Sequence, residues 1–221
     1  MKKKIQVNKN HYDFSKYVNK ERFMSYYYQL KYIYNLNSKN ILEIGPGNNF
    51  LKNNLKEHFN IKTLDIDQNL KPDFVGSIDK IPLKNNSFDL IVCFQVLEHL
   101  PFNKFEVALK ELKRVSRKDV LISLPYSGED IGFQLKIPFL GIFSISKRIS
   151  KFYKKHKFDG QHYWEIGKKG YSKSKIIKIL KKYFIIKEIK NPYENKYHIF
   201  FKLRKKYERT KNFSNNVSIQ C

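Results

Sequence analysis

The stretch Ile41–Phe50, ILEIGPGNNF, decides how this chain folds. A short apolar run that carries Glu43 leads into the turn Gly45-Pro46-Gly47, and a helix-like segment, Phe50–Leu55, follows. This order predicts a buried parallel strand, a tight turn and the start of a helix. Because glycine has no Cβ atom, such a turn lets a ligand lie directly against the backbone.

A second acidic strand end, Asp65 in the sequence TLDID, follows about twenty residues later, which is the spacing of a βαβ unit that binds a nucleoside. In such a unit the second carboxylate accepts hydrogen bonds from ribose hydroxyls. The sequence therefore predicts a nucleoside site between the two strand ends.

The residues of the turn exclude two common nucleotide sites. A dinucleotide site reads G-x-G-x-x-G, but Phe50 occupies the position of its third glycine. A phosphate-binding P-loop needs Gly-Lys-Ser/Thr, and Asn48-Asn49 supplies no lysine. Glu43 would in addition repel a polyphosphate. An acidic strand end beside this turn suits a cationic ligand that carries a ribose.

With these features the sequence resembles the class I S-adenosylmethionine-dependent methyltransferases, in their small-molecule (methyltransferase type 11-like) branch. The resemblance covers residues 40–126. It rests on three blocks in the family's order and spacing, which are EIGPG at Glu43–Gly47 with Asp65, SFDLIV at Ser87–Val92 leading into VLEHLP at Val96–Pro101, and KELKRV at Lys110–Val115 followed by VLISLP at Val120–Pro125.

The resemblance implies an α/β fold, with a Rossmann-like, doubly wound, mostly parallel seven-stranded sheet and an antiparallel last strand. It implies S-adenosylmethionine as the cofactor. The residues expected to bind the cofactor are Glu43, Gly45, Pro46, Gly47, Asp65, Ile66, Ser77, Ile78 and Gln95.

The chain departs from the family at two positions. Asn49 stands where a third glycine is common, and asparagine enters left-handed backbone conformations at modest cost. Ser77 stands where an acidic residue often meets the adenine amino group, and Asp79 comes two residues later. We therefore expect backbone groups of Ser77 and Ile78 to recognise adenine.

The composition constrains the partners and the compartment. A net charge of +24 suggests a polyanionic partner, but lysines spread along the whole chain favour a bias of the proteome instead. Two distant cysteines, Cys93 and Cys221, form no disulfide framework, and no metal-ligand spacing stands out, so we expect no metal. No signal peptide or transmembrane run is expected, and the chain is assigned to the cytoplasm.

The alternation of strands and helices predicts a parallel sheet that is covered on both faces. We expect a helical cover over residues 1–39, a cofactor-binding core over 40–126, a substrate lid inserted over 127–170, a helix and hairpin over 171–204 that complete the domain, and a flexible tail over 205–221. Strands are expected at 40–44, 61–66, 73–75, 89–94, 119–124, 184–189 and 197–203, and helices at 104–117 and 172–183. Tyrosines in the cover could line a substrate site or simply pack on the core.

The lid segment carries an apolar stretch over 133–145 and then a basic, helix-like piece over 146–155. Inserted segments of this length are often lids or binding loops. Apolar residues flanked by lysines could also rest on a membrane surface.

Two histidines are candidate catalytic bases, because histidine is the commonest general base near neutral pH. His99 follows the fourth strand, and His162 lies in a cluster with Trp164 in the lid. Either histidine could instead be structural. Glu98 is interpreted as bridging backbone groups or as solvated, and His198 is expected to point away from the pocket.

The sequence therefore predicts an S-adenosylmethionine-dependent methyltransferase that acts on a small-molecule acceptor such as a sugar, a lipid precursor or a metabolite. Two alternatives remain open at this stage. The first is an RNA methyltransferase, which the charge suggests but which lacks an Asn/Asp-Pro-Pro-Tyr/Phe block after the fourth strand. The second is a non-catalytic protein that keeps the fold as a scaffold.

Overall fold

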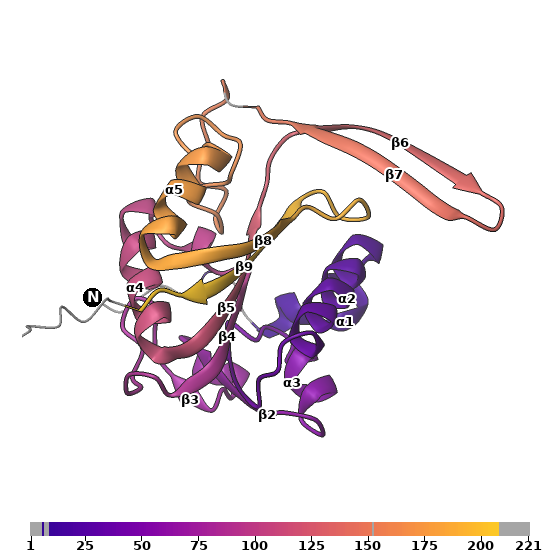
Figure 1. The fold of residues 1–221 in the computed structure, drawn as a ribbon. Helices are drawn as coiled ribbons and strands as arrows, with labels where there is room; N and C mark the ends of the chain where they lie inside the picture. Colours follow the sequence, from indigo (N-terminus) through magenta and orange to yellow (C-terminus); the bar gives the residue numbers. More distant parts are fainter. Residues whose placement is uncertain (1–5, 7–8, 152, 208–221) are drawn as a thin grey trace, which may run out of the picture.

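The computed structural model describes residue 6 and residues 9–151 and 153–207. A seven-stranded sheet in the order β3-β2-β1-β4-β5-β9-β8 forms its centre (Figure 1). Strands β1 to β5 pair in parallel, and β9 runs antiparallel to both β5 and β8, which confirms the predicted fold. The strands are β1 (Asn40–Ile44), β2 (Asn60–Asp65), β3 (Phe74–Val75), β4 (Phe88–Phe94), β5 (Ser116–Pro125), β8 (Phe184–Lys190) and β9 (His198–Lys205).

Helices cover both faces of the sheet. In Figure 1, α1, α2 and α3 lie on one side, and α4 and α5 lie on the other. The helices are α1 (Phe14–Tyr17), α2 (Lys20–Tyr34), α3 (Phe50–Leu55), α4 (Phe105–Val115) and α5 (Lys173–Tyr183), with 3-10 turns η1 (Lys9–Tyr12), η2 (Gln68–Leu70), η3 (Leu97–His99) and η4 (Phe102–Lys104). The sheet thus separates two apolar cores, one on each face.

The helix α4 illustrates how the pattern of apolar residues places a helix on the sheet. Its apolar residues recur three or four positions apart, so they form one stripe along the helix. That stripe is completely buried against the sheet, and it consists of Phe105, Ala108, Leu109, Leu112 and Val115. Residues on the opposite side of the helix, such as Lys110, face solvent.

The turn after β1 has the backbone conformation that its glycine and asparagine residues predict. Gly45 and Gly47 adopt φ angles of +69° and +55°. Asn49 has a φ of +59° and precedes α3, so asparagine does take the left-handed conformation in place of a third glycine. At Gly45 a Cβ atom would also lie 2.6 Å from Val96 Cγ2. The turn therefore brings bare backbone to the edge of the sheet.

The inserted segment forms a hairpin of β6 (Glu129–Ile137) and β7 (Gly141–Ile149) outside the main sheet. It projects away from the body of the molecule (Figure 1). The basic, helix-like interpretation of residues 146–155 was wrong, because Ser146–Ile149 pair with β6 as part of β7.

After the hairpin, the chain returns to the body of the molecule at Trp164. The indole is completely buried between Phe102 and Phe105, and its Nε1 donates to the carbonyl oxygen of Leu100 at 3.1 Å. Tyr163 N also donates to Glu98 O at 2.8 Å. This end of the predicted lid is therefore fixed beside η3.

The C-terminal hairpin and the last strand are longer than predicted. Lys205, placed by the sequence in a flexible tail, belongs to β9, and residues 208–221 of that tail lie outside the described residues. Of the helices in the described ranges, none combines the length and the apolar content that crossing a lipid bilayer requires.

Candidate cofactor and acceptor site

One cavity, of about 660 Å³, lies at the carboxyl ends of β1, β2 and β4. Ligands of open α/β sheets bind at this edge. Every residue that the sequence assigned to the cofactor lines it, and so do both histidines proposed as bases. These residues are Glu43, Gly45, Pro46, Gly47, Asp65, Ile66, Ser77, Ile78, Gln95, His99 and His162. Their roles in binding or catalysis stay predictions.

Glu43 is a nearly buried carboxylate in this cavity. Its side chain is 5% exposed, and its Oε2 atom has no hydrogen-bond partner among the described residues. The pKa of Glu43 is raised to about 8, mainly by burial and in smaller part by the charge of Asp65, while Lys52 opposes the increase. A buried carboxyl oxygen without a hydrogen-bond partner is costly, so this position favours a ligand that brings a cation or a donor.

Asp65 ends the neighbouring strand and is half-buried. Its Oδ1 accepts a hydrogen bond from the backbone N–H of Asp67 at 2.8 Å, and burial raises the pKa of its carboxyl group. Since β1 and β2 are adjacent, with Ile44 opposite Leu64, the two acidic strand ends face one cavity with the glycine turn beside them.

Ser77 and Asp79 lie together at the next part of the wall. The hydroxyl of Ser77 donates to Asp79 Oδ1 at 2.7 Å, and both residues line the cavity. The sequence interpretation set Asp79 aside because it comes two residues after the family's acidic position. The structure brings its carboxylate to the cavity all the same, because the turn at Ser77–Lys80 folds back on itself.

Sequence reasoning left open whether tyrosines of the N-terminal segment line the site or simply pack on the core, and it named no residue there as a site residue. Tyr12, Tyr17, Arg22, Tyr26 and Gln29 all line the cavity. The ring of Tyr12 packs over the glycine turn so closely that a Cβ atom on Gly47 would lie 3.1 Å from it. The abundance of tyrosine was the only signal, and it did not indicate which rings would face the ligand.

His99 is a half-buried, neutral imidazole. Its Nδ1 atom lies 3.0 Å from the carbonyl oxygen of Gln161 and 2.8 Å from Gln6 Oε1. Because a carbonyl oxygen only accepts, Nδ1 carries the proton and Nε2 carries the lone pair. The pKa of His99 is lowered to about 4, mainly by burial and in smaller part by the charge of His162.

His162 belongs to a chain of polar groups behind the cavity wall. Its Nδ1 lies 3.2 Å from Glu165 Oε1, and the Tyr197 hydroxyl donates to the same carboxylate. Burial opposes protonation, yet Glu165 and the charge of Glu98 raise the pKa of the His162 imidazole above its ordinary value. A carboxylate that orients an imidazole in this way is typical of a general base.

The structure corrects the expectations for Glu98 and His198. Glu98 is not solvated, since its side chain is completely buried below the two histidines. His198, expected to point away, lines the cavity, and its Nδ1 lies 2.8 Å from the hydroxyl of Ser25. Burial lowers the pKa of His198 to about 3, so it is neutral.

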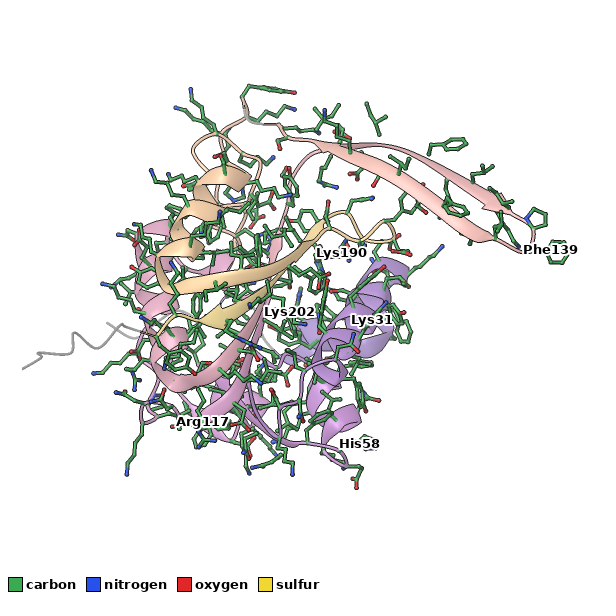
Figure 2. All side chains as sticks on the ribbon, viewed as in Figure 1. Lys31, His58, Arg117, Phe139, Lys190 and Lys202 are labelled. Atoms are coloured by element: carbon green, nitrogen blue, oxygen red, sulfur yellow. The ribbon has the colours of Figure 1, made fainter. Side chains whose placement is uncertain are left out.

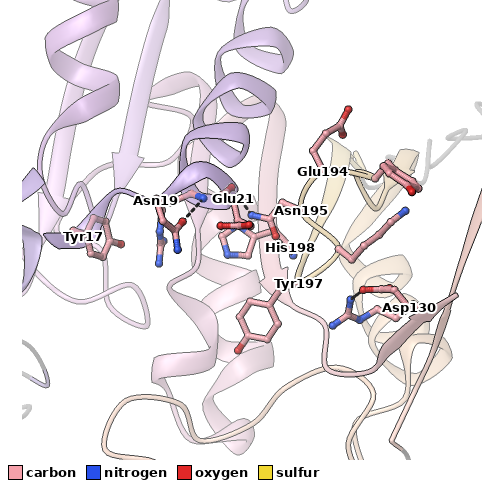
Figure 3. A pocket seen from close by; sticks show the side chains of 12 residues that line it. Tyr17, Asn19, Glu21, Asp130, Glu194, Asn195, Tyr197 and His198 are labelled. Atoms are coloured by element: carbon pink, nitrogen blue, oxygen red, sulfur yellow. Dashed lines mark hydrogen bonds and ion pairs between the residues drawn. The ribbon is translucent and has the colours of Figure 1, made fainter. Parts of the chain in front are cut away.

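Figure 3 shows a second cavity, of about 410 Å³, between the start of α2, the loop before β9 and the base of the β6–β7 hairpin. Its walls share Tyr17, Arg22, Tyr197 and His198 with the first cavity. Asn195, whose Nδ2 donates to the carbonyl oxygen of Glu21 at 2.8 Å, fixes the loop to α2. The two cavities therefore meet at one group of side chains.

Comparison with known proteins agrees with this geometry. A family model described as "Methyltransferase domain" matches residues 42–124. An uncharacterised protein of Methanocaldococcus jannaschii is 39% identical over 69 residues, which cover 28% of this chain and 29% of that protein. The chain thus spans less than a third of that relative.

Solved structures share the fold at low identity. A protein of Pyrococcus horikoshii OT3 is 14% identical with a TM-score of 0.58, covering 90% of this chain and 100% of that one. The N-methyltransferase NodS of Bradyrhizobium japonicum WM9, in complex with S-adenosyl-L-homocysteine, is 12% identical with a TM-score of 0.57, covering 91% and 95%. An S-adenosylmethionine-dependent methyltransferase of Clostridium acetobutylicum has the same identity and TM-score, covering 89% and 96%.

Proposed function

We propose that this chain, whose residues 42–124 form a methyltransferase domain of the class I fold, uses S-adenosylmethionine to methylate a small-molecule acceptor. The observation that carries this proposal is the pair of carboxylates at adjacent strand ends. Glu43 and Asp65 face one cavity, and the bare backbone of the glycine turn lies beside them.

Each part of the cavity wall suits a different part of the cofactor. Asp65 accepts hydrogen bonds from ribose hydroxyls, which is the role of the second carboxylate in βαβ nucleoside sites. Glu43 faces the cationic amino acid portion. Ser77, Ile78 and Asp79 meet the adenine ring. Bound S-adenosylmethionine supplies an electrophilic methyl group, and the protein mainly positions the acceptor and excludes water.

The acceptor binds between His99, His162 and the N-terminal tyrosines. This part of the wall combines aromatic surfaces with a few polar groups, which is typical of small-molecule sites. His162, held by Glu165, accepts the proton of an acceptor hydroxyl or amine. The second cavity, which meets the first at Tyr197 and His198, is the route by which the acceptor enters.

Calorimetry with S-adenosylhomocysteine tests the cofactor site. The unmodified protein should bind one equivalent. Asp65→Asn should weaken binding about 10–100-fold, because a hydrogen bond to a charged group contributes roughly 1.5–3 kcal/mol. Glu57→Gln, an exposed carboxylate outside the cavity, is the matched control and should bind normally. An unmodified protein that does not bind the compound would leave only the scaffold alternative.

The β6–β7 hairpin supports a further element of this function, which is contact with an anionic membrane surface. Residues opposite each other in a hairpin share a face. Ile131, Phe133 and Leu135 thus share one face with Phe143 and Ile145, and all five are exposed. The other face contacts the body of the molecule only at its base, where Lys196 donates to Ser146 and Gly132 packs against Tyr193. Farther along that face, Gln134, Ile142 and Ser144 are exposed.

The tip of the hairpin extends this apolar surface. Phe139 stands at its free end, far from the body of the molecule (Figure 2). Leu140 follows it in the turn between β6 and β7, and both residues are exposed. Lys136 and Lys147 flank the apolar residues, and the chain carries a net charge of +24. Apolar insertion together with lysines is the combination that binds anionic lipid surfaces. The acceptor of such an enzyme is an amphipathic molecule at that surface.

Flotation with phosphatidylserine vesicles tests this contact. We expect the unmodified protein to float with the vesicles at low salt and the double variant Phe139→Asp/Leu140→Asp to remain in the soluble fraction. Ile185→Asp, at an exposed apolar position on β8, is the matched control and should float. Equal flotation of both variants would contradict a role for the tip.

A further inference from the structure

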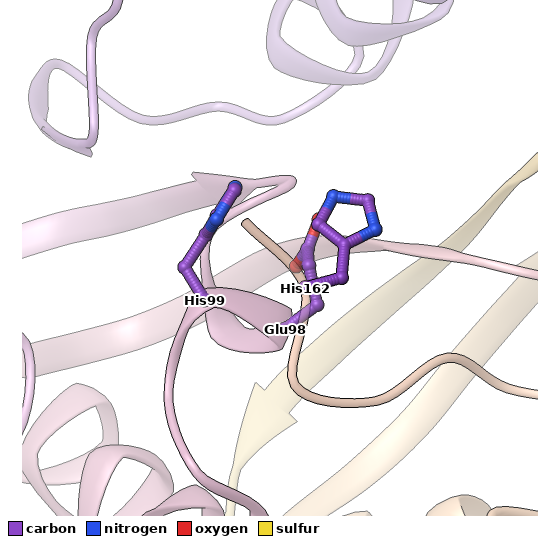
Figure 4. A group of neighbouring side chains, drawn as sticks. All are labelled: Glu98, His99 and His162. Carbon is purple, nitrogen blue, oxygen red and sulfur yellow. The ribbon is translucent and has the colours of Figure 1, made fainter. Parts of the chain in front are cut away.

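Three potential metal ligands from two distant segments meet at the wall of the cavity. Glu98 and His99 lie at the end of η3, just after β4, and His162 comes from the segment that returns after the hairpin. One ligand atom of each lies within 4.8 Å of the other two. Figure 4 shows the Glu98 carboxylate beside the His162 ring, with His99 on the same side of the turn.

One oxygen of the buried Glu98 carboxyl group lacks a hydrogen-bond partner among the residues that the structure describes, although His162 lies nearby as a partner in charge. The side chain is completely buried, and its Oε2 atom forms no hydrogen bond within the described part of the chain. Turning the Gln95 amide would let it donate to Glu98 Oε1 at 3.2 Å, but Oε2 would still have no partner. Because buried polar groups are almost always paired, an orphaned carboxylate oxygen points to a ligand or an ion.

The rings of both histidines are oriented by hydrogen bonds of the kind that orient metal-binding histidines. His99 Nδ1 donates to the carbonyl oxygen of Gln161, and His162 Nδ1 donates to the carboxylate of Glu165. A histidine that binds a metal usually donates its other ring N–H to a carbonyl or a carboxylate, which fixes the ring and directs the second nitrogen at the ion. In both rings that second nitrogen is Nε2.

We propose that Glu98, His99 and His162 bind a divalent transition-metal ion in the acceptor part of the cavity. Two imidazoles and one carboxylate are a ligand set used by zinc and non-haem iron sites that keep open positions for a substrate. The sequence did not suggest this site, because His162 is distant in the chain and no local spacing joins it to Glu98 and His99.

A second group near His162 does not offer an equivalent site. Asp159, His162 and Glu165 also lie within 4.8 Å of one another. However, Asp159 Oδ1 already accepts hydrogen bonds from the backbone N–H groups of Gln161 at 2.9 Å and His162 at 2.7 Å. Glu165 is likewise engaged by Tyr197 and His162. These carboxylates orient the segment, whereas Glu98 retains an unpaired oxygen.

With the ion bound, His162 Nε2 would be a metal ligand, so the ion would activate the acceptor as a Lewis acid in place of His162 acting as the base. A divalent ion that binds an acceptor hydroxyl lowers the pKa of that hydroxyl and fixes its position. This use of the ion rests on the proposed function, whereas the binding of the ion does not.

Metal binding is tested on the purified full chain after treatment with a chelator. Titration with Co²⁺, followed by its visible absorption and by calorimetry, should give one site, and Zn²⁺ should compete for it. Glu98→Gln and His162→Ala should abolish this site. Glu165→Gln, which removes only the group that orients His162, should weaken binding about 10–100-fold.

Two controls make the result specific. His58→Ala, an exposed histidine outside the cavity, should bind Co²⁺ as the unmodified protein does. Asp159→Asn should do the same, because asparagine keeps the side-chain oxygen that accepts from Gln161 and His162 and loses only the charge. Binding of S-adenosylhomocysteine, measured in parallel, reports whether each variant retains its fold and separates failure of the metal site from failure of the cofactor site. Absence of Co²⁺ binding, or equal binding by Glu98→Gln and the unmodified protein, would overturn the proposal.

Discussion

Glu43 makes the stability of the ligand-free protein depend on pH. Burial raises its pKa from 4.5 to about 8, so the folded state favours the neutral carboxyl group. The neutral Glu43 carboxyl group stabilises the folded state fully at pH values below its pKa in the unfolded chain. This stabilisation is lost as the pH rises through its pKa in the folded protein. Each unit of difference between the two pKa values corresponds to about 1.4 kcal/mol. We expect the free energy of unfolding to fall by a few kcal/mol between pH 5 and pH 9.

The variant Glu43→Gln isolates this effect. It should reduce the loss of stability between pH 5 and pH 9, measured by urea unfolding at each pH, while it weakens binding of S-adenosylmethionine. Part of the loss should remain, because burial also raises the pKa of Glu98, to about 7. Glu57→Gln, at an exposed position, should leave the pH dependence unchanged. An unchanged pH dependence in Glu43→Gln would mean that this carboxyl group is ionised in the folded protein.

Asn49 is the residue where the turn departs from its family pattern. Its φ of +59° is strained for most side chains, and glycine adopts it freely. We expect Asn49→Gly to be nearly neutral and Asn49→Val to cost about 1–2 kcal/mol, measured by urea unfolding. Asn53→Val, at an exposed position inside α3, should cost only a few tenths of a kcal/mol. Equal losses of unfolding free energy at the two positions would show that the left-handed conformation of Asn49 does not affect stability.

At the scale of single residues, the sequence predicted the groups whose positions follow from one local motif. Glu43, Gly47 and Asp65 sit at strand ends and turns, so their place at the sheet edge follows from the strand pattern. The tyrosines of the N-terminal segment and the contact between Glu98 and His162 could not be found this way. They depend on how distant segments pack, which no local spacing encodes.

At the scale of elements, strands and helices with regular patterns were predicted to within a few residues. Strand β1 has the predicted bounds, and α4 differs by one or two residues at its ends. The error over residues 146–155 has a physical cause. Lysines and apolar residues there fit a helical spacing, but Ser146–Ile149 gain their backbone hydrogen bonds from β6, and pairing with another segment overrides local propensity.

The β6–β7 hairpin should be dispensable for folding. Its apolar face is exposed, and it contacts the body through a few groups such as Arg148, which lies over the Tyr126 ring. Replacing residues 130–148 with a short glycine–serine linker should change the thermal midpoint by only a few degrees. Binding of S-adenosylhomocysteine should be unchanged, because the cofactor cavity is lined by other residues. Loss of that binding would instead make the hairpin part of the cofactor site.

At the scale of the whole molecule, the observed sheet confirms the predicted architecture. The architecture could be predicted because a parallel sheet follows from the alternation of strands and helices. The antiparallel direction of β9 was also predictable, because the connection after β8 is short and brings the two strands side by side as a hairpin. The projecting direction of the hairpin could not be predicted, since it depends on the contacts of Lys196 and Tyr193 at its base. Topology was therefore predictable, and the placement of the insertion was not.

The net charge of +24 leads to a prediction about the whole molecule. Its lysines are spread along the chain, so polyanions should bind through general attraction to phosphates. Such binding falls steeply with salt, because each neutralised phosphate releases a counterion. We expect bulk RNA to bind at 50 mM salt and to dissociate by about 300 mM, where exposed charges are strongly screened. S-adenosylhomocysteine, held in a partly buried cavity, should keep its affinity over the same range in calorimetry. RNA binding that persisted at the higher salt concentration would indicate a specific nucleic-acid surface and would reopen the question of the acceptor.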